Sequence, residues 1–284
     1  MYSDKTLPVN SYLDDFLDRE DREEKRRRML SESREDVKTA YSTADHPIMQ
    51  AISTYKEIEK VKGIIYERLE EWYSIYFPEL KNLNQDAYAD VVSAMKEVGN
   101  ITTEDMEKIA GEQGLEMLKE IEGNQTRPKV GDEEYKALKE LAKTEKDLSE
   151  LQKTLDKFIA ESVGKTLPNV THLIEPRIAA ELLLKAGSVE RLATFPASTI
   201  QLLGAEKALF KHLKFGSRPP KYGVLFKLPQ LSNASKKQRG RLARTYATKI
   251  SIAARADAYT KRFIADKLKE QLDKTVANIM KNEG

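Results

Sequence analysis

The sequence predicts a mainly α-helical chain, in which a long antiparallel coiled-coil hairpin with a small helical tip precedes a compact helical domain. Apolar residues recur in steps of three or four over two long stretches, prolines then divide the chain into shorter helical pieces, and strand-type alternation is nearly absent. We expect a charged, flexible leader at residues 1–40, the arm at 41–164, the helical domain at 165–276 and a tail at 277–284. The alternative for the arm is that its two helices belong to one compact bundle.

The leader is dominated by charge, because 17 of the 23 residues from Asp14 to Asp36 are Asp, Glu, Lys or Arg. Such a segment has too few apolar side chains to offset the entropy lost on ordering. We therefore expect it to be poorly ordered or only conditionally helical. Its basic cluster at residues 25–28 can attract RNA or an acidic partner, although a solvated tail explains it equally well.

The first arm helix is predicted from a stripe of apolar residues that ends at Pro78, which disrupts a helix interior. The stripe consists of Ile48, Ile52, Tyr55, Ile58, Val61, Ile65, Leu69, Trp72 and Tyr76. The second helix starts near Asp132 and shows a heptad seam of Leu141, Leu148 and Leu155, with Leu151 and Phe158 beside it. Between them, residues 79–131 have enough apolar residues for two or three short helices. Each long helix is apolar on one side only, so each needs a partner.

Beyond residue 165, six prolines separate helical segments at 177–185, 205–213 and from Lys236 past Phe263. In the second of these, Leu209, Phe210 and Leu213 are expected to face inward. Residues 222–228 are the best short strand candidate.

The composition excludes several classes of protein. The chain has no Cys and no long uncharged apolar stretch, which excludes disulfide scaffolds, thiolate zinc sites and a membrane span. No signal peptide is apparent, so we expect an intracellular protein. The three histidines are scattered, and no phosphate-binding, dinucleotide-binding or nucleophile-elbow motif is present. We expect no catalysis, metal or cofactor.

The near-neutral net charge of +2 hides a strong asymmetry along the chain. Residues 165–284 have 23 basic and 9 acidic side chains, whereas residues 1–164 have 25 basic and 37 acidic ones. Between Glu206 and Arg262 there are 15 basic residues and only two acidic ones. This imbalance favours a polyanion such as nucleic acid as partner of the C-terminal half. The alternative is a merely solvated basic surface.

The helix that begins near Lys236 separates its cations from its apolar residues. Leu242, Tyr246, Ile250 and Ala254 recur at fours and form the predicted buried stripe, while Lys237, Arg241, Arg244 and Arg255 lie on another face. Arg suits bidentate contact with phosphate, and Lys contacts it as a point charge. We therefore expect this exposed face to bind RNA phosphates.

A shaped loop precedes this helix at residues 216–223, with the sequence GSRPPKYG. Its Tyr222 can stack on an exposed base while Arg218 and Lys221 hold the backbone. That Tyr222 packs within its own loop is equally compatible with the spacing. Upstream, Gly204, Ala205, Glu206 and Lys207 open a short helix whose N-terminus can receive a phosphate or a partner carboxylate, unless Glu206 acts locally on the helix dipole.

These residues resemble the Nop domain family. The resemblance lies in residues 168–171 (PNVT), 186–187 (AG), 196–207 (PASTIQLLGAEK), 219–223 (PPKYG), 238–244 (QRGRLAR) and 249–258 (KISIAARADA). Residues 71–80 (EWYSIYFPEL) resemble the coiled-coil arm of archaeal box C/D ribonucleoprotein core proteins. The resemblance spans residues 40–275 and extends to the eukaryotic nucleolar Nop proteins and a spliceosomal pre-mRNA-processing factor.

The resemblance implies a non-enzymatic scaffold that recognises a kink-turn in a box C/D guide RNA together with a small ribosomal-protein-like partner bound to it. Such a scaffold supports guide-directed 2′-O-ribose methylation by fibrillarin and pairs with a second copy through the arm. It would lie in the cytoplasm of an archaeal cell, or in the nucleolus or nucleus of a eukaryote. The alternative is a dimerising interaction protein of the splicing-factor type, which binds RNA–protein complexes without recruiting fibrillarin.

Two departures from the family pattern affect these expectations. The fibrillarin-binding N-terminal domain has no match here, so the chain is truncated, the domain is encoded separately, or fibrillarin is not recruited directly. Tyr222 stands where histidine is frequent, and Glu175 where glycine is common. The expected RNA-facing residues are Lys207, Arg218, Lys221, Tyr222, Lys237, Arg239, Arg241 and Arg244. The expected contacts to the partner protein are Gly204, Ala205 and Glu206.

Overall fold

The computed structural model describes residues 10–41, 44–97, 99–124 and 126–281, which form two compact units, residues 1–46 and 47–284. In the first unit, α1 (Asn10–Tyr41) is a single helix, and its side chains from 21 to 35 are exposed. Ion pairs one turn apart, Glu23–Arg27 and Arg28–Glu32, support it. Each such pair stabilises a helix by only about 0.2–0.5 kcal/mol, so the flexibility of this segment stays a prediction.

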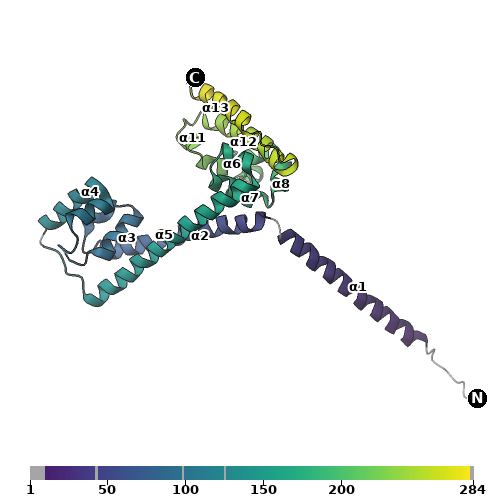
Figure 1. The fold of residues 1–284 in the computed structure, drawn as a ribbon, viewed down its shortest axis with the longest axis horizontal. Helices are drawn as coiled ribbons and strands as arrows, with labels where there is room; N and C mark the ends of the chain where they lie inside the picture. The colour runs from purple at the N-terminus through teal and green to yellow at the C-terminus, as the bar shows by residue number, and fades with distance from the viewer. Residues whose placement is uncertain (1–9, 42–43, 98, 125, 282–284) are drawn as a thin grey trace, which may run out of the picture. The chain divides into compact units, whose positions relative to one another are not determined.

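The arm consists of α2 (Asp45–Tyr73) and α5 (Asp132–Thr166), whose contacts run in opposite directions along the chain (Figure 1). Lys62 of α2 meets Glu145 of α5 at 3.2 Å, and ten residues further along α2 the Trp72 indole N–H donates to Glu134 at 2.6 Å. As the residue number increases along α2, the residue number of its partner on α5 decreases, as an antiparallel hairpin requires.

The buried face of α5 differs from the predicted heptad seam. Leu138, Ala142, Glu145, Ser149, Ile159 and Val163 are buried, whereas Leu151 and Phe158 are exposed and Leu141, Leu148 and Leu155 are only partly covered. Val61 and Trp72 of the predicted α2 stripe are exposed as well. Lys62 of α2 contacts both Glu145 and Ser149 of α5 inside the hairpin, so polar residues occupy buried positions that an apolar pattern cannot reveal.

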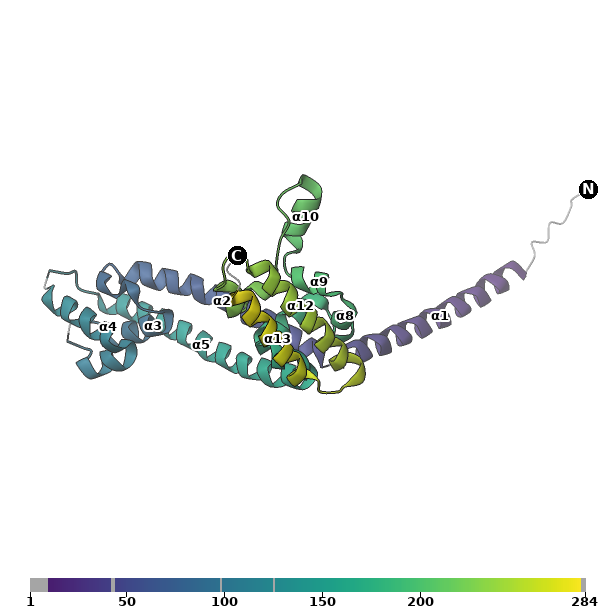
Figure 2. The same ribbon diagram turned by 90° about the horizontal axis from the view of Figure 1, so that it is seen from above.

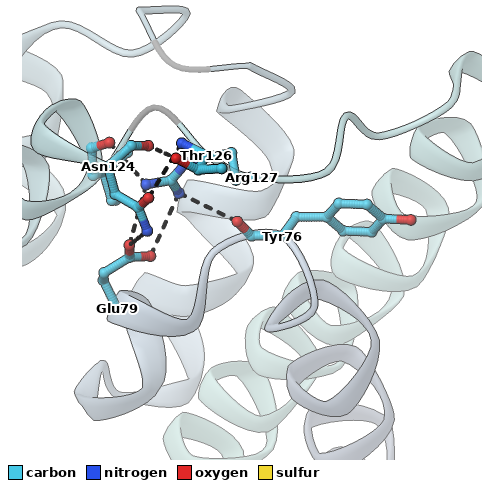
Figure 3. Close-up of polar contacts among 6 residues, drawn as sticks. Tyr76, Glu79, Asn124, Thr126 and Arg127 are labelled. Carbon is cyan, nitrogen blue, oxygen red and sulfur yellow. Dashed lines mark hydrogen bonds and ion pairs between the residues drawn. The ribbon is translucent and has the colours of Figure 1, made fainter.

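The tip contains η1 (Pro78–Asn82), α3 (Gln85–Ala94) and α4 (Thr103–Gly123), around a core that includes Tyr73, Tyr88 and Met106. Arg127 holds the returning chain in place (Figure 3). Its guanidinium pairs with Glu79 at 3.1 Å, donates to the Ile121 and Tyr76 carbonyls at 2.8 and 3.2 Å, and lies 5.0 Å from the centre of the Phe77 ring.

The C-terminal half is a cluster of helices that pack against one face of α12. Its elements are α6 (Pro168–Leu173), α7 (Pro176–Ala186), α8 (Val189–Thr194), α9 (Ala197–Leu202), α10 (Glu206–Phe215), η2 (Val224–Lys227), α11 (Pro229–Ser232), α12 (Arg239–Arg255), η3 (Ala256–Thr260) and α13 (Ala265–Lys281). The part of the chain that the structure describes contains no strand. The mainly α-helical prediction is confirmed, and the strand candidate at 222–228 is wrong, because Val224–Lys227 form a 3₁₀ turn.

The helix predicted from Lys236 past Phe263 is interrupted. After Arg255 it widens into the π-helical turn η3, Lys261 adopts a left-handed conformation with φ +53°, and α13 starts at Ala265. The break is imposed from a distance: the Asn169 side chain donates to the Arg262 carbonyl at 2.9 Å and accepts from the Ile264 N–H at 2.7 Å. Past it, α13 runs through residue 276 to Lys281, and its Ile279 is buried in the common core.

The arm is rooted in the same core as the C-terminal helices. Ile48 and Ile52 of α2, together with Ile159 and Val163 of α5, are buried in one cluster with Leu242 and the other core residues of α12. The arm and the domain therefore share their hydrophobic core rather than meeting at a linker.

Candidate nucleic-acid interface

The amphipathic character predicted for α12 is present. Leu242, Tyr246, Ile250 and Ala254 are buried, while Arg241 and Arg244 are exposed on the same helix. The helix start is fixed by Gln238, whose side-chain amide donates to the carbonyls of Ile279 and Met280 at 3.1 and 3.3 Å. No side chain of the described residues caps this end of α12, and the positive end of the helix dipole lies there together with the exposed Arg241, so it favours anions.

Arg239 differs from its neighbours, because its guanidinium is already engaged inside the protein. Its Nε–H and Nη2–H donate to the carbonyls of Ala234 and Ser232, both at 2.9 Å, and its Cζ lies 5.2 Å from the centre of the Phe226 ring. These contacts hold the loop before α12 against the helix. The geometry therefore argues against Arg239 as an RNA-facing residue, and gives it a role in positioning the loop.

Tyr222 is half-buried and stacks on Phe226, with ring centres 4.8 Å apart and planes inclined by 12°. One of its faces is therefore occupied within its own loop, which is the alternative that the spacing left open. Phe226 touches both Tyr222 and Arg239, and so connects the loop to the first turn of α12. Sequence reasoning missed Phe226, because a lone aromatic in a short apolar run gives no signal of this contact.

Two close backbone approaches fix the loop at residues 216–223. The N–H groups of Gly223 and Val224 donate to the carbonyls of Gln201 and Leu203 at 3.0 and 2.8 Å. A Cβ on Gly223 would lie 2.0 Å from the Leu203 carbonyl oxygen, so only glycine fits there. Gly204 faces the same constraint, with φ +91° and a Cβ position 2.6 Å from the Val224 side chain.

Glu206, one of the expected partner-protein contacts, is used locally. Its carboxylate accepts the Gly204 N–H at 2.7 Å and lies 3.9 Å from the Lys185 ammonium. Partial burial alone would raise its pKa, but the hydrogen bonds from the Gly204 and Glu206 N–H groups outweigh burial and hold the pKa below its usual range. Glu206 therefore closes the turn at residues 204–206, as the local alternative anticipated.

Of the three α10 residues expected to face inward, Leu209 is partly buried, but Phe210 and Leu213 are exposed. Phe210 and Leu213 are 70% and 71% exposed, Phe215 is 70% exposed, and the helix has no buried residue. Figure 2 shows α10 standing away from the helices around α12. Periodicity predicts that a helix has an apolar face, but it does not say which element covers that face. Here Lys207, Lys211 and Lys214 accompany an apolar face that is left open.

The remaining predicted cations form an exposed set. Lys207, Arg218, Lys221, Lys237, Arg241 and Arg244 are all exposed, and no carboxylate in the described part of the chain lies within ion-pair distance of them. Since the loop at 216–223 is anchored to the turn at 201–204 and contacts α12 through Phe226, these cations come from elements that the fold connects directly. Such a set of unpaired cations suits phosphate.

The same described residues contain no group of three His, Asp or Glu side chains arranged to hold a metal ion. None of the helices described in the structure is both long enough and apolar enough to cross a bilayer.

Residues 54–278 match the Nop family, described as the snoRNA binding domain, fibrillarin. The chain belongs to the Nop family. A NOP5 family protein of Methanocaldococcus jannaschii, described as uncharacterized, is 36% identical over 245 residues, which cover 86% of this chain and 59% of that protein. Nucleolar protein 56 of Dictyostelium discoideum is 33% identical over 237 residues, covering 81% of this chain and 44% of its own length.

A solved structure has the same fold along nearly the whole chain. One chain of a fibrillarin/Nop5p complex superimposes with a TM-score of 0.50 at 22% identity, covering 98% of this chain and 87% of that one. Nucleolar protein 58 of Neurospora crassa is 34% identical over 228 residues, covering 80% of this chain and 38% of its own length. This Nop chain thus spans about half the length of the curated relatives that it matches.

Proposed function

We propose that this Nop protein is a non-enzymatic, RNA-binding scaffold of a box C/D-type ribonucleoprotein. It would recognise a kink-turn RNA together with the small ribosomal-protein-like partner bound to it, and so support guide-directed 2′-O-ribose methylation. The observation that carries the proposal is the set of six exposed cations on α10, on the anchored loop, and on α12 and the residues just before it, none of them neutralised by a carboxylate in the described part of the chain. The match to a snoRNA-binding family supports RNA as the polyanion.

Within this proposal, the cations bind RNA, and the apolar face of α10 supplies the surface for the partner protein. Phe210, Leu213 and Phe215 stand one turn or less from Lys211 and Lys214. A composite ligand would meet both kinds of side chain, because its protein part would cover the apolar residues and its RNA phosphates would contact the lysines. Gly204 and Ala205 would contribute backbone at the base of α10, with Glu206 holding their turn.

A gel shift with kink-turn RNA, with and without the small partner protein, tests the composite recognition. We expect binding only when both are present. The variant Arg241→Ala/Arg244→Ala should weaken assembly without changing the melting temperature, because both side chains are exposed. The slope of log affinity against log salt should become shallower by roughly 1.4–1.8, since each phosphate contact contributes about 0.7–0.9.

A matched control is Lys143→Ala/Lys157→Ala, which removes two exposed cations from α5 of the arm. This control should assemble like the native chain. Equal weakening in both double variants would mean that binding depends on total charge alone, and would refute the proposed site.

The second candidate function, a dimerising interaction protein, is favoured by one observation on the arm. Val61, Ile64, Leu151 and Phe158 are exposed although they lie on helices whose other faces are buried. A second copy of the arm can cover them, which also agrees with the homodimer implied by the resemblance. Ile64→Lys/Phe158→Lys should convert a dimer to a monomer in light scattering; a native chain that is monomeric at every concentration tested would exclude pairing through the arm.

Recruitment of fibrillarin and the cellular location belong to the same proposal. The chain would act in the cytoplasm of an archaeal cell, or in the nucleolus of a eukaryotic one, where it would meet the methyltransferase. Co-purification of fibrillarin with the native particle decides between the methylation scaffold and the splicing-factor-like alternative.

A further inference from the structure

The turn that joins α12 to α13 carries exposed basic and aromatic side chains. Tyr259 is 61% exposed and Phe263 is 55% exposed, an unusual degree for large aromatic rings. Lys261 and Arg262 lie between them, and Arg255 precedes Tyr259 by four residues; all three are exposed, although the Arg255 Nε–H already donates to the Ala193 carbonyl at 3.2 Å. No carboxylate among the residues that the structure describes forms an ion pair with any of these three cations.

This turn is held in one conformation by buried hydrogen bonds. The Asp257 carboxylate, which is buried, accepts from the N–H groups of Asn169 and Val170 at 3.0 and 3.1 Å and from the Asn169 side chain at 2.6 Å. Asn169 in turn binds the Arg262 carbonyl and the Ile264 N–H. The backbone that carries Tyr259 and Phe263 is therefore fixed before any ligand arrives, which lowers the entropic cost of binding.

The neighbours of the two rings leave aromatic surface open. Phe263 meets the His172 ring edge to face, with centres 5.5 Å apart, and the His172 Nε2 lies 3.3 Å from the exposed carboxylate of Asp266. Tyr259 has no ring partner among the described residues. Exposed aromatic faces beside unpaired cations are the combination that holds unpaired nucleotides, because bases stack on the rings while the cations contact phosphates.

We propose that the α12–α13 turn is a second RNA site, which binds a single-stranded segment through Tyr259, Phe263, Lys261 and Arg262. It is distinct from the site around Arg241 and Arg244, since fifteen residues, or about 20 Å of helix, separate Arg244 from Tyr259. The inference rests on the proposed function only in taking RNA as the polyanion. Its ligand is a strand without base pairs, whereas the first site takes a folded RNA with its protein.

The test crosses two variants with two probes, using the full chain. The probes are a fluorescein-labelled decamer of uridine, followed by anisotropy at low salt, and the kink-turn RNA with its small partner protein, followed by gel shift. Tyr259→Ala should weaken decamer binding roughly tenfold, within the range expected for one lost stacking contact, and leave the kink-turn complex unchanged. Arg241→Ala/Arg244→Ala should show the reverse pattern. Tyr259→Phe keeps the ring and should bind the decamer like the native chain.

Lys261 offers a second, charge-specific test. Its φ of +53° is costly for most residues but free for glycine, so Lys261→Gly removes the cation without straining the backbone. We expect weaker decamer binding and a salt slope shallower by about 0.7. A change in melting temperature with unchanged affinity would instead show that Lys261 only complements the end of the helix, and would count against the site.

Four outcomes would overturn the inference. The native chain could fail to bind the decamer, or Tyr259→Ala could bind the decamer as tightly as the native chain does. Tyr259→Ala could also weaken the binding of both probes equally, or could lose binding to the small partner protein measured without RNA. The last would make the turn a protein-docking surface. Failure of the kink-turn complex, with decamer binding still dependent on Tyr259, would refute the proposed function and leave the second site standing.

Discussion

Replacing Lys62 by Met should destabilise the arm in a strongly pH-dependent way. Lys62 is buried between α2 and α5, where it pairs with Glu145 and Asp86, each at 3.2 Å, and contacts Ser149. Glu145 is fully buried, and neither of its carboxylate oxygens has a hydrogen-bond donor in good geometry among the described residues. Met keeps the length and apolar stem of Lys62, so the substitution removes the charge with little change in packing.

The magnitude follows from the cost of leaving Glu145 unpaired. Burial raises the pKa of Glu145 and the Lys62 ammonium opposes this, so removing Lys62 raises that pKa further. Protonating a carboxyl with an unfolded pKa of about 4.3 costs about 3.7 kcal/mol at pH 7, which caps the loss. This agrees with the ~3–5 kcal/mol typical of a broken buried pair. Asp86 keeps its hydrogen bond from Ser149 at 2.5 Å and is half exposed, so it adds little.

The pH dependence has a definite sign. In the variant, the folded chain binds a proton at Glu145 that the unfolded chain releases above its own pKa, so the free energy of unfolding falls as pH rises. The stability lost in the variant should increase with pH until the pKa of Glu145 in the folded variant is passed, and should shrink by about 1.4 kcal/mol per pH unit from pH 7 down to pH 5. Urea unfolding at several pH values, followed by the fluorescence of Trp72 on α2, measures it; Trp72 is the single tryptophan of the chain.

A second variant separates the charge from the packing. In Lys62→Met/Glu145→Leu both charges are gone, and apolar replacement of a buried pair is often neutral or stabilising, so most of the lost stability should return. If the double variant is as unstable as the single one, or if the deficit of Lys62→Met is the same at pH 5 and pH 8, the reasoning about Glu145 is refuted.

Two further substitutions act at the tip and at the loop. Arg127→Ala leaves the largely covered Glu79 carboxylate without its guanidinium and removes two carbonyl contacts, so the tip should lose about 2–4 kcal/mol of stability. Hydrogen exchange should become faster in α3 and α4 but not in α12. An equal increase in exchange in α12 would contradict a local role for Arg127. Gly223→Ala places a Cβ 2.0 Å from the Leu203 carbonyl oxygen, so it should detach the loop and lower the affinity for the kink-turn complex. The control Gly240→Ala has open space around it and should be neutral or slightly stabilising. Equal affinity of both variants for the kink-turn complex would show that the loop plays no part in binding.

Periodicity predicted the long helices and the buried stripe of α12, but it missed the buried face of α5 and the features that distant contacts set. The buried stripe of α12 follows from residues four apart on one helix, and its exposed arginines follow from the same spacing. The break after Arg255 has no glycine or proline to announce it. It is set by Asn169, almost ninety residues earlier, through hydrogen bonds that only the folded chain brings together.

The same distinction applies to the candidate interface. Arg239, Arg241 and Arg244 look alike in sequence. Of the three, Arg239 is the one whose guanidinium binds the carbonyls of Ala234 and Ser232 and lies over the Phe226 ring. The partners of Arg239 depend on how the loop at 226–234 folds back, which no pattern of charge can reveal. The exposed face of α10 is the opposite case: the pattern correctly shows an apolar face, and only the structure shows that nothing in the described chain covers it.

The shared core gives the arm a role beyond that of a spacer. Ile48 and Ile52 begin α2 and Ile159 and Val163 end α5, and all four are buried with the residues that hold α12 in place. A flexible connection would need exposed backbone and few apolar contacts at this junction. Because the junction is instead part of the core, a second copy bound along the arm would fix the direction of each arm and, with it, the position of each set of α12 cations. Dimerisation through the arm would thereby set the distance between two RNA sites, so a dimer-breaking variant should keep its affinity for a single kink-turn complex and lose its preference for RNAs that carry two.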